Sequence, residues 1–288
     1  MIKLARLNTP IGDAARGDRI FTGEVIVQDA IAGIEPLIAR ADTMIRAAFA
    51  PHHPEGAHGA LDADAYAQIC EALIADFQRD GDIRSLFRAL FRDAGVDTER
   101  VYWDKLRLRI QPPGESPMSR RLRNLPAHRD TWGSNLLCQI NWWAPIYPVT
   151  AARTLVLYPA HWAVPIANTS ASWDYEALRR VRRKRGDYPQ LPVATAEVDT
   201  TDAWPAVIDP GALLSFSGAH LHASIPNRSQ VARFNMETRT VSIDDLIAKR
   251  QAPDLDGAAP RRPLEWFVRI ADGAPLEEAA DQFLRQKK

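Results

Sequence analysis

The sequence predicts an α+β fold that is mainly β, in which a jelly-roll barrel is buttressed by helices at both ends of the chain. Three observations lead to this prediction. Apolar residues recur at helical spacing through the first hundred residues, short strand-like runs separated by turn residues follow, and one more helical pattern closes the chain. A helical layer followed by many short strands is typical of a barrel supported by helices.

The length of 288 residues suits a single large domain. We expect that domain to have four parts, which are helical support over residues 1–100, a barrel core over 101–245, an insertion over 162–205 within that core, and a helical tail over 246–288.

The N-terminal part predicts one strand and three helices. The strand is expected over residues 20–28, and the helices over 30–49, 63–78 and 83–91. The first helix ends before Pro51, because a proline pushes the residue before it out of the helical region. The following loop carries His52, His53 and His58 among Pro and Gly. A loop of this composition does not pre-position ligands, so we interpret it as a solvated polar loop.

The barrel part begins with a strictly alternating run over residues 103–111. Alternation places Leu106, Leu108 and Ile110 on one face of a strand and Lys105, Arg107 and Arg109 on the other. Further strands are expected over residues 136–143, 154–158, 213–216 and 234–241.

The insertion is long and irregular, as lids and binding loops often are. It contains Trp173 and a basic run from Arg179 to Arg185. The simpler interpretation of that run is the exposed face of a short helix, and its role is left open. The tail contains Trp266 and a final helix expected over residues 276–284.

Composition excludes several classes of function. Lys plus Arg and Asp plus Glu are equal at 36 each, so nothing in the charge indicates a nucleic acid or a membrane surface as partner. The two cysteines, Cys70 and Cys138, make no disulfide framework, which fits a reduced cytoplasmic setting. The N-terminus lacks the apolar core of a signal peptide, and no run is long enough to span a bilayer. No nucleic-acid or membrane partner is therefore expected, and the oligomeric state is left open.

Three residues predict a metal site. His128 and Asp130 are separated by one residue, so on a strand both side chains point to the same face. Residues 209–216 read as a turn and a buried strand that delivers a histidine from elsewhere in the barrel. His220 and His222 share strand parity, and we favour His222. Two imidazoles and one carboxylate on one face of a metal are the site of non-haem Fe(II) oxygenases.

Arg233 favours His222 over His220. It lies eleven residues beyond His222, on the next strand after a turn centred on Pro226 and Asn227. A buried guanidinium is costly unless it meets a carboxylate. A dicarboxylate co-substrate that chelates the metal at one end would supply that carboxylate at the other. Ser224 has the same parity as His222 and is placed to donate a further hydrogen bond, whereas Arg239 is a weaker candidate for this role.

These motifs resemble the phytanoyl-CoA dioxygenase-like branch of the Fe(II)/2-oxoglutarate-dependent oxygenases. The resemblance covers about residues 103–240 and is carried by Gln111-Pro-Pro-Gly, His128-Arg-Asp130, Tyr158-Pro-Ala-His161 and the run from His222 through Asn227-Arg-Ser229 to Arg233. It implies a double-stranded β-helix, the cupin-like form of the jelly roll.

The resemblance also implies the roles of the site residues. His128, Asp130 and His222 would bind Fe(II), Arg233 with Ser224 would hold the distal carboxylate of 2-oxoglutarate, and Asn141 would lie beside this co-substrate. The implied reaction uses O₂ and releases succinate and CO₂ while a small molecule is hydroxylated or desaturated. Because Asp130 is present, no metal position is vacated for chloride, and halogenation is not expected.

Four further residues are candidates for the substrate pocket. Trp132 is the aromatic residue nearest the ligands. Arg107 and Arg109 either bind an acidic substrate or pair with Glu or Asp. His161 is interpreted as structural or as a residue of the pocket rim, because a fourth protein ligand would block an open metal position.

Two alternatives remain from the sequence. One is a cupin-like metalloenzyme with the same three ligands and no 2-oxoglutarate, against which Arg233 and Ser224 argue. The other is a non-catalytic jelly-roll binding module whose histidines are satisfied in the core. A hydrolase with Ser224 as nucleophile is set aside, because Ser224 lacks the nucleophile-elbow context.

Overall fold

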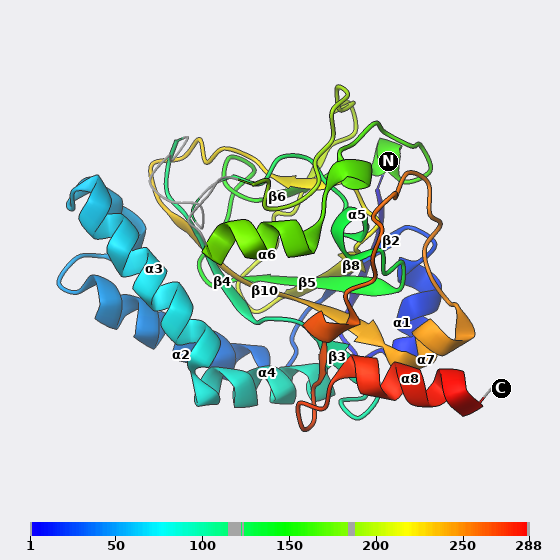
Figure 1. Ribbon diagram of the computed structural model, residues 1–288. Coiled ribbons are helices and arrows are strands. Elements are labelled where there is room, and N and C mark those ends of the chain that lie inside the picture. The colour runs from blue at the N-terminus through cyan, green and yellow to red at the C-terminus, as the bar shows by residue number, and fades with distance from the viewer. Residues whose placement is uncertain (1, 115–121, 123, 184–187, 287–288) are drawn as a thin grey trace.

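The computed structural model describes residues 2–114, 122, 124–183 and 188–286, and its centre is a large, mainly antiparallel sheet (Figure 1). Within the described residues this sheet has eight strands. In spatial order they are β1 (Lys3–Leu7), β2 (Glu24–Gln28), β8 (Leu213–Ser217), β5 (Gln139–Pro145), β10 (Arg233–Ser242), β3 (Val101–Trp103) and β11 (Val268–Arg269), and β4 (Arg107–Gln111) also pairs with β10. Only the outer pair of β1 and β2 runs parallel among the pairs just named.

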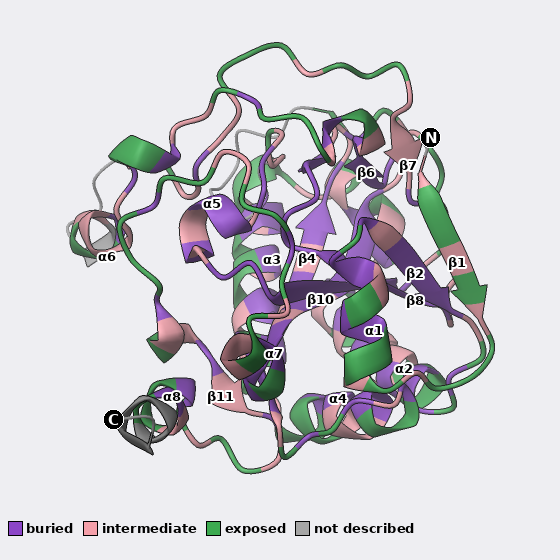
Figure 2. Cartoon of the chain, turned by 90° about the vertical axis from the view of Figure 1, so that its right-hand side faces the viewer, coloured by how far each residue is buried: buried purple, intermediate pink, exposed green. Residues whose placement is uncertain are grey.

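Strand alternation gives the sheet one apolar face and one partly polar face. Phe234 and Met236 of β10 join the main hydrophobic core, as do Leu108 and Ile110 of β4. The residues between them on β10, namely Arg233, Asn235, Glu237 and Arg239, therefore point to the opposite face. Figure 2 shows the central strands of this sheet as buried.

The apolar face is covered by α2 (Ile34–Phe49), α3 (Ala63–Arg79) and α4 (Gly81–Asp93), which lie together on one side of the sheet (Figure 1). The carboxylates of Asp62 and Asp80 accept hydrogen bonds from backbone N–H groups in the first turns of α3 and α4. Exposed residues lie on the outer faces of these helices (Figure 2). The three helices expected from the sequence are present.

A second sheet lies beside the polar face of the large one. It has three strands, in the order β7 (Trp204–Pro205), β6 (Leu155–Leu157) and β9 (His222–Ser224). An apolar cluster joins the two sheets, with Val25 and Val27 of β2 and Leu214 of β8 packed with Leu155 and Leu157 of β6. The space between the sheets is thus apolar in one part and, beside β9 and the polar face of β10, rich in charged side chains.

Two expectations differ from the structure in the sheet. The alternating run over residues 103–111 is interrupted, because Asp104 to Leu106 leave the sheet between β3 and β4. The buried Asp104 carboxylate accepts hydrogen bonds from Arg107 and Arg239 there, and these contacts outweigh the local strand propensity. The N-terminal region is also more than a helical support, since β1 and β2 extend the large sheet through the pairing of β2 with β8.

The remaining helices lie around the sheets. They are α1 (Asp13–Ile20), α5 (Thr131–Ser134), α6 (Tyr175–Arg183), α7 (Ile243–Ala248) and α8 (Leu276–Gln286). The expected basic run begins on α6, and its last two residues, Lys184 and Arg185, lie outside the described residues. Across the part of the chain that the structure describes, no helix combines the length and the apolarity that a bilayer crossing requires.

Candidate metal centre

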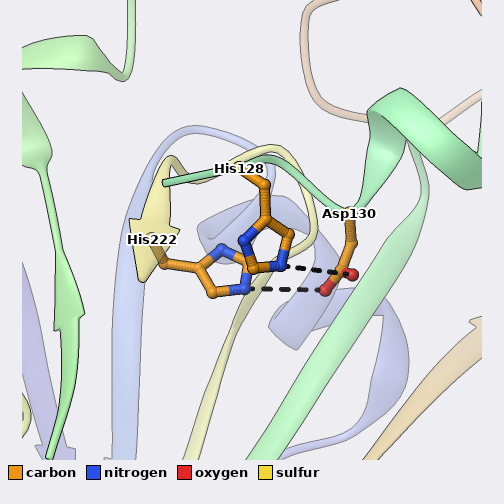
Figure 3. Close-up of side chains that lie close together, drawn as sticks. All are labelled: His128, Asp130 and His222. Carbon is orange, nitrogen blue, oxygen red and sulfur yellow. Dashed lines mark ion pairs between the residues drawn. The ribbon is translucent and has the colours of Figure 1, made fainter. Parts of the chain in front are cut away.

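Three side chains converge beside the polar face of the large sheet. His128, Asp130 and His222 each offer one ligand atom, and these atoms all lie within 4.8 Å of one another. The two imidazoles lie side by side, with Nε2 of each directed to Asp130 (Figure 3). His128 Nε2 lies 3.9 Å from Asp130 Oδ1, and His222 Nε2 lies 3.7 Å from Asp130 Oδ2. The group is one that could hold a metal ion, as the sequence predicts.

Backbone pairing brings the two histidines together. The N–H of His128 donates to the carbonyl of His222 at 3.0 Å, and the N–H of His222 donates to the carbonyl of His128 at 3.0 Å. Asp130 reaches the site differently from the expectation. It does not continue a strand, because its backbone is already helical and it is the N-cap residue of α5. The same-face argument for His128 and Asp130 is therefore wrong in mechanism, although the two side chains do meet.

Each imidazole is oriented by a backbone carbonyl. Nδ1 of His128 lies 2.7 Å from the carbonyl oxygen of Pro126, and Nδ1 of His222 lies 2.9 Å from that of His220. A carbonyl oxygen only accepts, so Nδ1 carries the proton in both rings and Nε2 presents a lone pair to the site. Burial, reinforced by the neighbouring His222, lowers the pKa of His128 to about 3, so its imidazole is neutral at pH 7.

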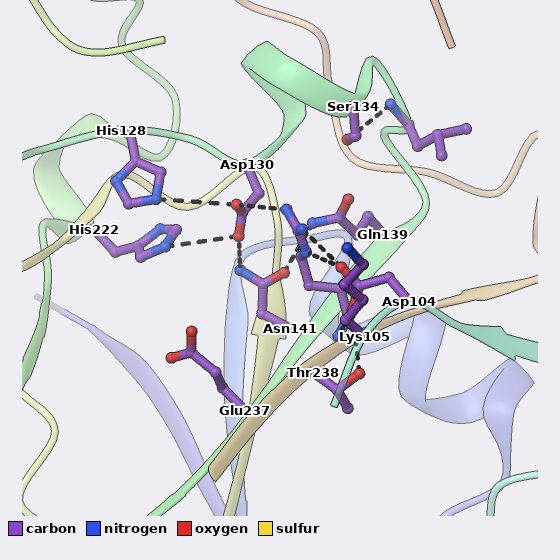
Figure 4. A network of polar contacts seen from close by, with 12 residues as sticks. Asp104, Lys105, His128, Asp130, Ser134, Gln139, Asn141, His222, Glu237 and Thr238 are labelled. Atoms are coloured by element: carbon purple, nitrogen blue, oxygen red, sulfur yellow. Dashed lines mark hydrogen bonds and ion pairs between the residues drawn. The ribbon is translucent and has the colours of Figure 1, made fainter. Parts of the chain in front are cut away.

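Asp130 is held as a carboxylate. Burial works against its ionisation, but the Arg239 guanidinium and the neighbouring imidazoles keep its pKa well below the usual range. Asn141 Nδ2 donates to Oδ2 at 2.5 Å, and Arg239 Nη1 donates to Oδ1 at 3.1 Å. Figure 4 shows the two histidines and Asn141 joined to Asp130, with Asp104 in the same network. Arg239 makes the connection between Asp130 and Asp104. Two neutral nitrogens and one anionic oxygen form the donor set.

Arg233 begins β10 and lies deep between the sheets. Its side chain is buried, and its Nη2 donates to Ser224 Oγ at 3.3 Å. Its Nε and Nη1 are buried without a hydrogen-bond partner among the described residues. Burial, with the positive charge of Arg109 as a second cause, lowers the pKa of Arg233. The pairing of Arg233 with Ser224 places the guanidinium two residues along β9 from His222.

His220 and His161 lie outside the metal centre. Nε2 of His220 is 3.2 Å from the carbonyl of Gly23, and its ring packs on Trp162 with 4.4 Å between centroids. Strand parity does not hold for His220, because β9 begins only at His222. His161 Nε2 accepts a hydrogen bond from the backbone N–H of Asp199 at 3.0 Å, which ties it to the insertion.

Of the substrate candidates, Arg107 and Arg109 line a cavity beside the metal centre, and Trp132 does not. Trp132 is fully buried, and its indole N–H donates to Asp256 at 2.7 Å, so it packs in the core instead of facing a ligand. Arg107 and Arg109 both line the pocket. Both are engaged in ion pairs, Arg107 with Asp104 and Arg109 with Glu237 at 2.7 Å and 2.8 Å.

Two cavities meet at the triad. The larger, of about 620 Å³, is lined by His128 and Asp130. Part of its wall is aromatic and is built from the insertion and the tail by Trp173, Tyr175 and Trp266. The smaller, of about 220 Å³, extends between the sheets and is lined by His222, Asn141, Trp143, Leu155, Phe216 and others. Glu237 lines both cavities.

Several residues of this centre escape sequence reasoning. They are Asp104, Glu237, Trp266 and the aromatic pair Trp173 and Tyr175. The sequence offers Arg239 only as a weaker candidate for the co-substrate carboxylate and not as a partner of Asp130. A usable signal existed on β10, because Arg233, Glu237 and Arg239 share parity and so face the same side. The aromatic wall had no such signal, since the insertion and the tail meet only in the folded chain.

Comparisons with known proteins give weak likenesses. No protein-family model matches the chain, and no curated protein matches it. The structure of EvdO2 from Micromonospora carbonacea var. aurantiaca aligns over 83% of this chain and 94% of its own, at 15% identity and a TM-score of 0.48. EvdO2 has also been solved in complex with 2-oxoglutarate, and that structure aligns with a TM-score of 0.44.

Two other solved structures align over most of their length. The non-heme alpha ketoglutarate dependent carbocyclase SnoK from nogalamycin biosynthesis covers 90% of this chain and 98% of its own, at 14% identity and a TM-score of 0.45. EctD from S. alaskensis with bound Fe covers 93% and 87%, at 17% identity and a TM-score of 0.39. With TM-scores below 0.5 these likenesses establish no family, and the function must be argued from the side chains of this chain.

Proposed function

We propose that this protein is an Fe(II)/2-oxoglutarate-dependent oxygenase that hydroxylates or desaturates a small molecule and releases succinate and CO₂. The finer assignments to the phytanoyl-CoA dioxygenase-like branch and to a jelly-roll barrel belong to the same proposal. The observation that carries it is the pairing of a His-Asp-His centre with a buried guanidinium, two of whose nitrogens have no hydrogen-bond partner among the described residues.

The donor set fits iron. His128 and His222 present neutral Nε2 atoms, Asp130 presents an anionic oxygen, and all three come from one side of the site. Two histidines and one carboxylate with open positions suit non-haem Fe(II). Bound there, Fe(II) would supply the redox chemistry that activates O₂ with 2-oxoglutarate as the reductant. The protein's own part is to hold the ion and to leave the cavity side of it free.

The surroundings of Arg233 fit the distal carboxylate of 2-oxoglutarate. Ser224 lies two positions beyond His222 on β9, a rise of about 7 Å, which matches the scale of a five-carbon diacid. Nε and Nη1 of Arg233 have no acceptor within the described part of the chain, and a carboxylate would satisfy both nitrogens. Ser224 Oγ accepts from Arg233 Nη2, which leaves the hydroxyl proton of Ser224 for the same carboxylate.

The larger cavity fits a small-molecule substrate. It reaches Asp130 and His128 at its floor, and its volume of about 620 Å³ lies in the range of small-molecule pockets. Arg109 and Glu237 form an ion pair in its wall, so polar groups of a substrate would be oriented there against fixed charges. The aromatic part of the wall would exclude water from that side of the cavity.

Turnover of 2-oxoglutarate tests the proposal. Protein reconstituted with Fe(II) is incubated with 2-oxoglutarate and O₂ in the presence of amino acids, acyl-CoAs or secondary metabolites, and succinate is measured. We expect succinate release that requires the metal and disappears in Asp130→Ala. Metal binding without any succinate across the panel would favour a cupin-like metalloenzyme that uses no 2-oxoglutarate. Absence of metal uptake would favour a binding module.

A further inference from the structure

We propose that Arg239, anchored by the buried Asp104, is a positioning residue that fixes the carboxylate of Asp130 for metal binding. The inference deepens the proposed function because it concerns the same metal site. It depends only on that site binding a divalent cation, and it stands whether or not 2-oxoglutarate is the co-substrate.

Arg239 bridges two carboxylates. Its Nη1 donates to Asp130 Oδ1 at 3.1 Å, whereas its Nε donates to Asp104 Oδ2 at 2.7 Å. Its Nη2 also lies 2.7 Å from Asp104 Oδ2. The planar guanidinium therefore holds Asp104 with one edge and Asp130 with the other. A lysine could not span both partners in this way, because its ammonium is a single point of charge.

Asp104 is a fixed anchor. Its side chain is 2% exposed. Beyond Arg239 it accepts from both terminal nitrogens of Arg107 at 2.9 Å and 2.7 Å, and from Thr238 Oγ1 at 3.2 Å. The backbone N–H of Arg239 donates to its Oδ1 at 3.1 Å. A carboxylate with so many donors does not rotate freely, so it holds the Arg239 guanidinium in a fixed position relative to the sheet.

Asn141 completes the arrangement from the neighbouring strand. It is the direct cross-strand partner of Arg239, and the two side chains reach Asp130 from adjacent strands. Asn141 donates to Asp130 Oδ2, and its own Oδ1 accepts from Gln139 at 2.9 Å. Each oxygen of Asp130 thus faces one histidine and takes one hydrogen bond from the large sheet. Turning the carboxylate would break both bonds.

Electrostatic repulsion alone would disfavour an arginine at position 239, beside a cation-binding site. A guanidinium beside a cation site repels the cation, so removing the positive charge of Arg239 should tighten metal binding if Coulomb repulsion were its only effect. Positioning has the opposite consequence, because a carboxylate that is free to rotate binds the metal less well. Partners that orient metal ligands typically contribute 10- to 100-fold in metal affinity. The two effects therefore predict changes of opposite sign.

The test measures Co(II) affinity by calorimetry in the absence of 2-oxoglutarate. Arg239→Gln removes both the positive charge and the planar guanidinium that reaches two carboxylates. Arg239→Lys keeps the charge and removes the guanidinium geometry. Arg109→Gln is the matched control. Arg109 lines the same cavity and pairs with Glu237, but it makes no described contact with Asp130. We expect both Arg239 variants to lose roughly 10- to 100-fold in affinity, and Arg109→Gln to stay close to the wild type. The visible spectrum of bound Co(II) should change in the Arg239 variants and not in the control.

Tighter or unchanged Co(II) binding in Arg239→Gln overturns the proposal, as does an equal loss in Arg109→Gln. Circular dichroism of the metal-free proteins checks folding. If Arg239→Gln does not fold, Arg239→Lys decides alone, since charge repulsion predicts no change there and positioning predicts a loss. If the wild type binds Co(II) but releases no succinate, the oxygenase proposal fails, and the Co(II) affinities of the variants still test the role of Arg239. A wild type that binds no Co(II) ends both.

Discussion

The backbone around each histidine decides what its side chain does. His222 is the first residue of β9 and shares a bridge with His128, so its ring is turned into the site. His220, two residues earlier, precedes the strand and is directed to Gly23 and Trp162. His161 is tied to the insertion through Asp199. Of these three imidazoles, that of His222 is therefore a candidate metal ligand, and those of His220 and His161 have structural contacts instead.

Replacing His222 with Ala should abolish metal binding, because it removes one of the three donors. His220→Ala should retain it, since that ring lies against Gly23 and Trp162. Co(II) titration of both metal-free variants by calorimetry measures the difference. Binding that survives in His222→Ala and is lost in His220→Ala would move the ligand assignment to His220.

Replacing Arg233 should have opposite effects on the stability of the ligand-free protein and on its affinity for 2-oxoglutarate. Arg233→Met removes a buried guanidinium, two of whose nitrogens bond to none of the residues that the structure describes, so the ligand-free protein should be as stable as the wild type or more stable. The same change should weaken 2-oxoglutarate binding by roughly 30-fold or more, about 2 kcal/mol, because the carboxylate loses its partner.

Calorimetric titration of Co(II)-loaded protein with 2-oxoglutarate and thermal unfolding without ligand give the two measurements. Arg228→Met is the control, because Arg228 is exposed in the adjoining turn and should leave the affinity unchanged. Equal 2-oxoglutarate affinities for Arg233→Met and the wild type would remove Arg233 from the co-substrate site.

At the scale of elements, the site is held by segments that are distant in sequence. The tail supplies Asp256, whose carboxylate accepts from Arg129 Nε at 3.2 Å, from Trp132 Nε1 at 2.7 Å and from the backbone N–H of Ile166 at 3.0 Å. Arg129 and Trp132 stand on either side of Asp130 in the chain. Asp256 thus connects the metal-binding segment to the insertion, and this explains why Trp132 faces the core.

Asp256→Asn should destabilise the protein by about 3 kcal/mol, because an amide cannot accept from all three donors and Arg129 is left buried beside a neutral group. Urea unfolding measures the change. Asp254→Asn, an exposed position in the same loop that caps Gly257, should change the free energy of unfolding by less than about 0.5 kcal/mol. Equal effects at the two positions would rule out the connecting role of Asp256.

At the scale of the whole molecule, the candidate metal centre lies where the two sheets meet. His222 belongs to the small sheet through β9, whereas Asp130 is fixed to the large sheet by Asn141 of β5 and Arg239 of β10. A bound metal would therefore link the two sheets in addition to serving the chemistry. Elsewhere the apolar cluster of β2, β5, β6 and β8 also joins the two sheets, and the hydrogen bond from Arg233 of β10 to Ser224 of β9 does so as well.

Metal binding should accordingly raise the stability of the entire fold. A divalent ion at 100 times its Kd adds about 2.7 kcal/mol, which corresponds to a rise in Tm of roughly 5 °C for a chain of this size. Thermal unfolding of the wild type with Co(II), and again after addition of a chelator, measures the effect. His222→Ala should show no shift, and a wild type without a shift would contradict the link between the sheets.

The sequence by itself determined the helices over the apolar face, most strands, and the likeness of His128, Asp130 and His222 to an iron site. Those features follow from local periodicity and from the few residue types that bind metals. The tertiary structure alone decided that Asp104 breaks a strand, that Arg239 turns to Asp130, and that Trp132 packs against Asp256. Each of these depends on a buried charge or donor that finds its partner more than a hundred residues away, and no local pattern encodes that distance.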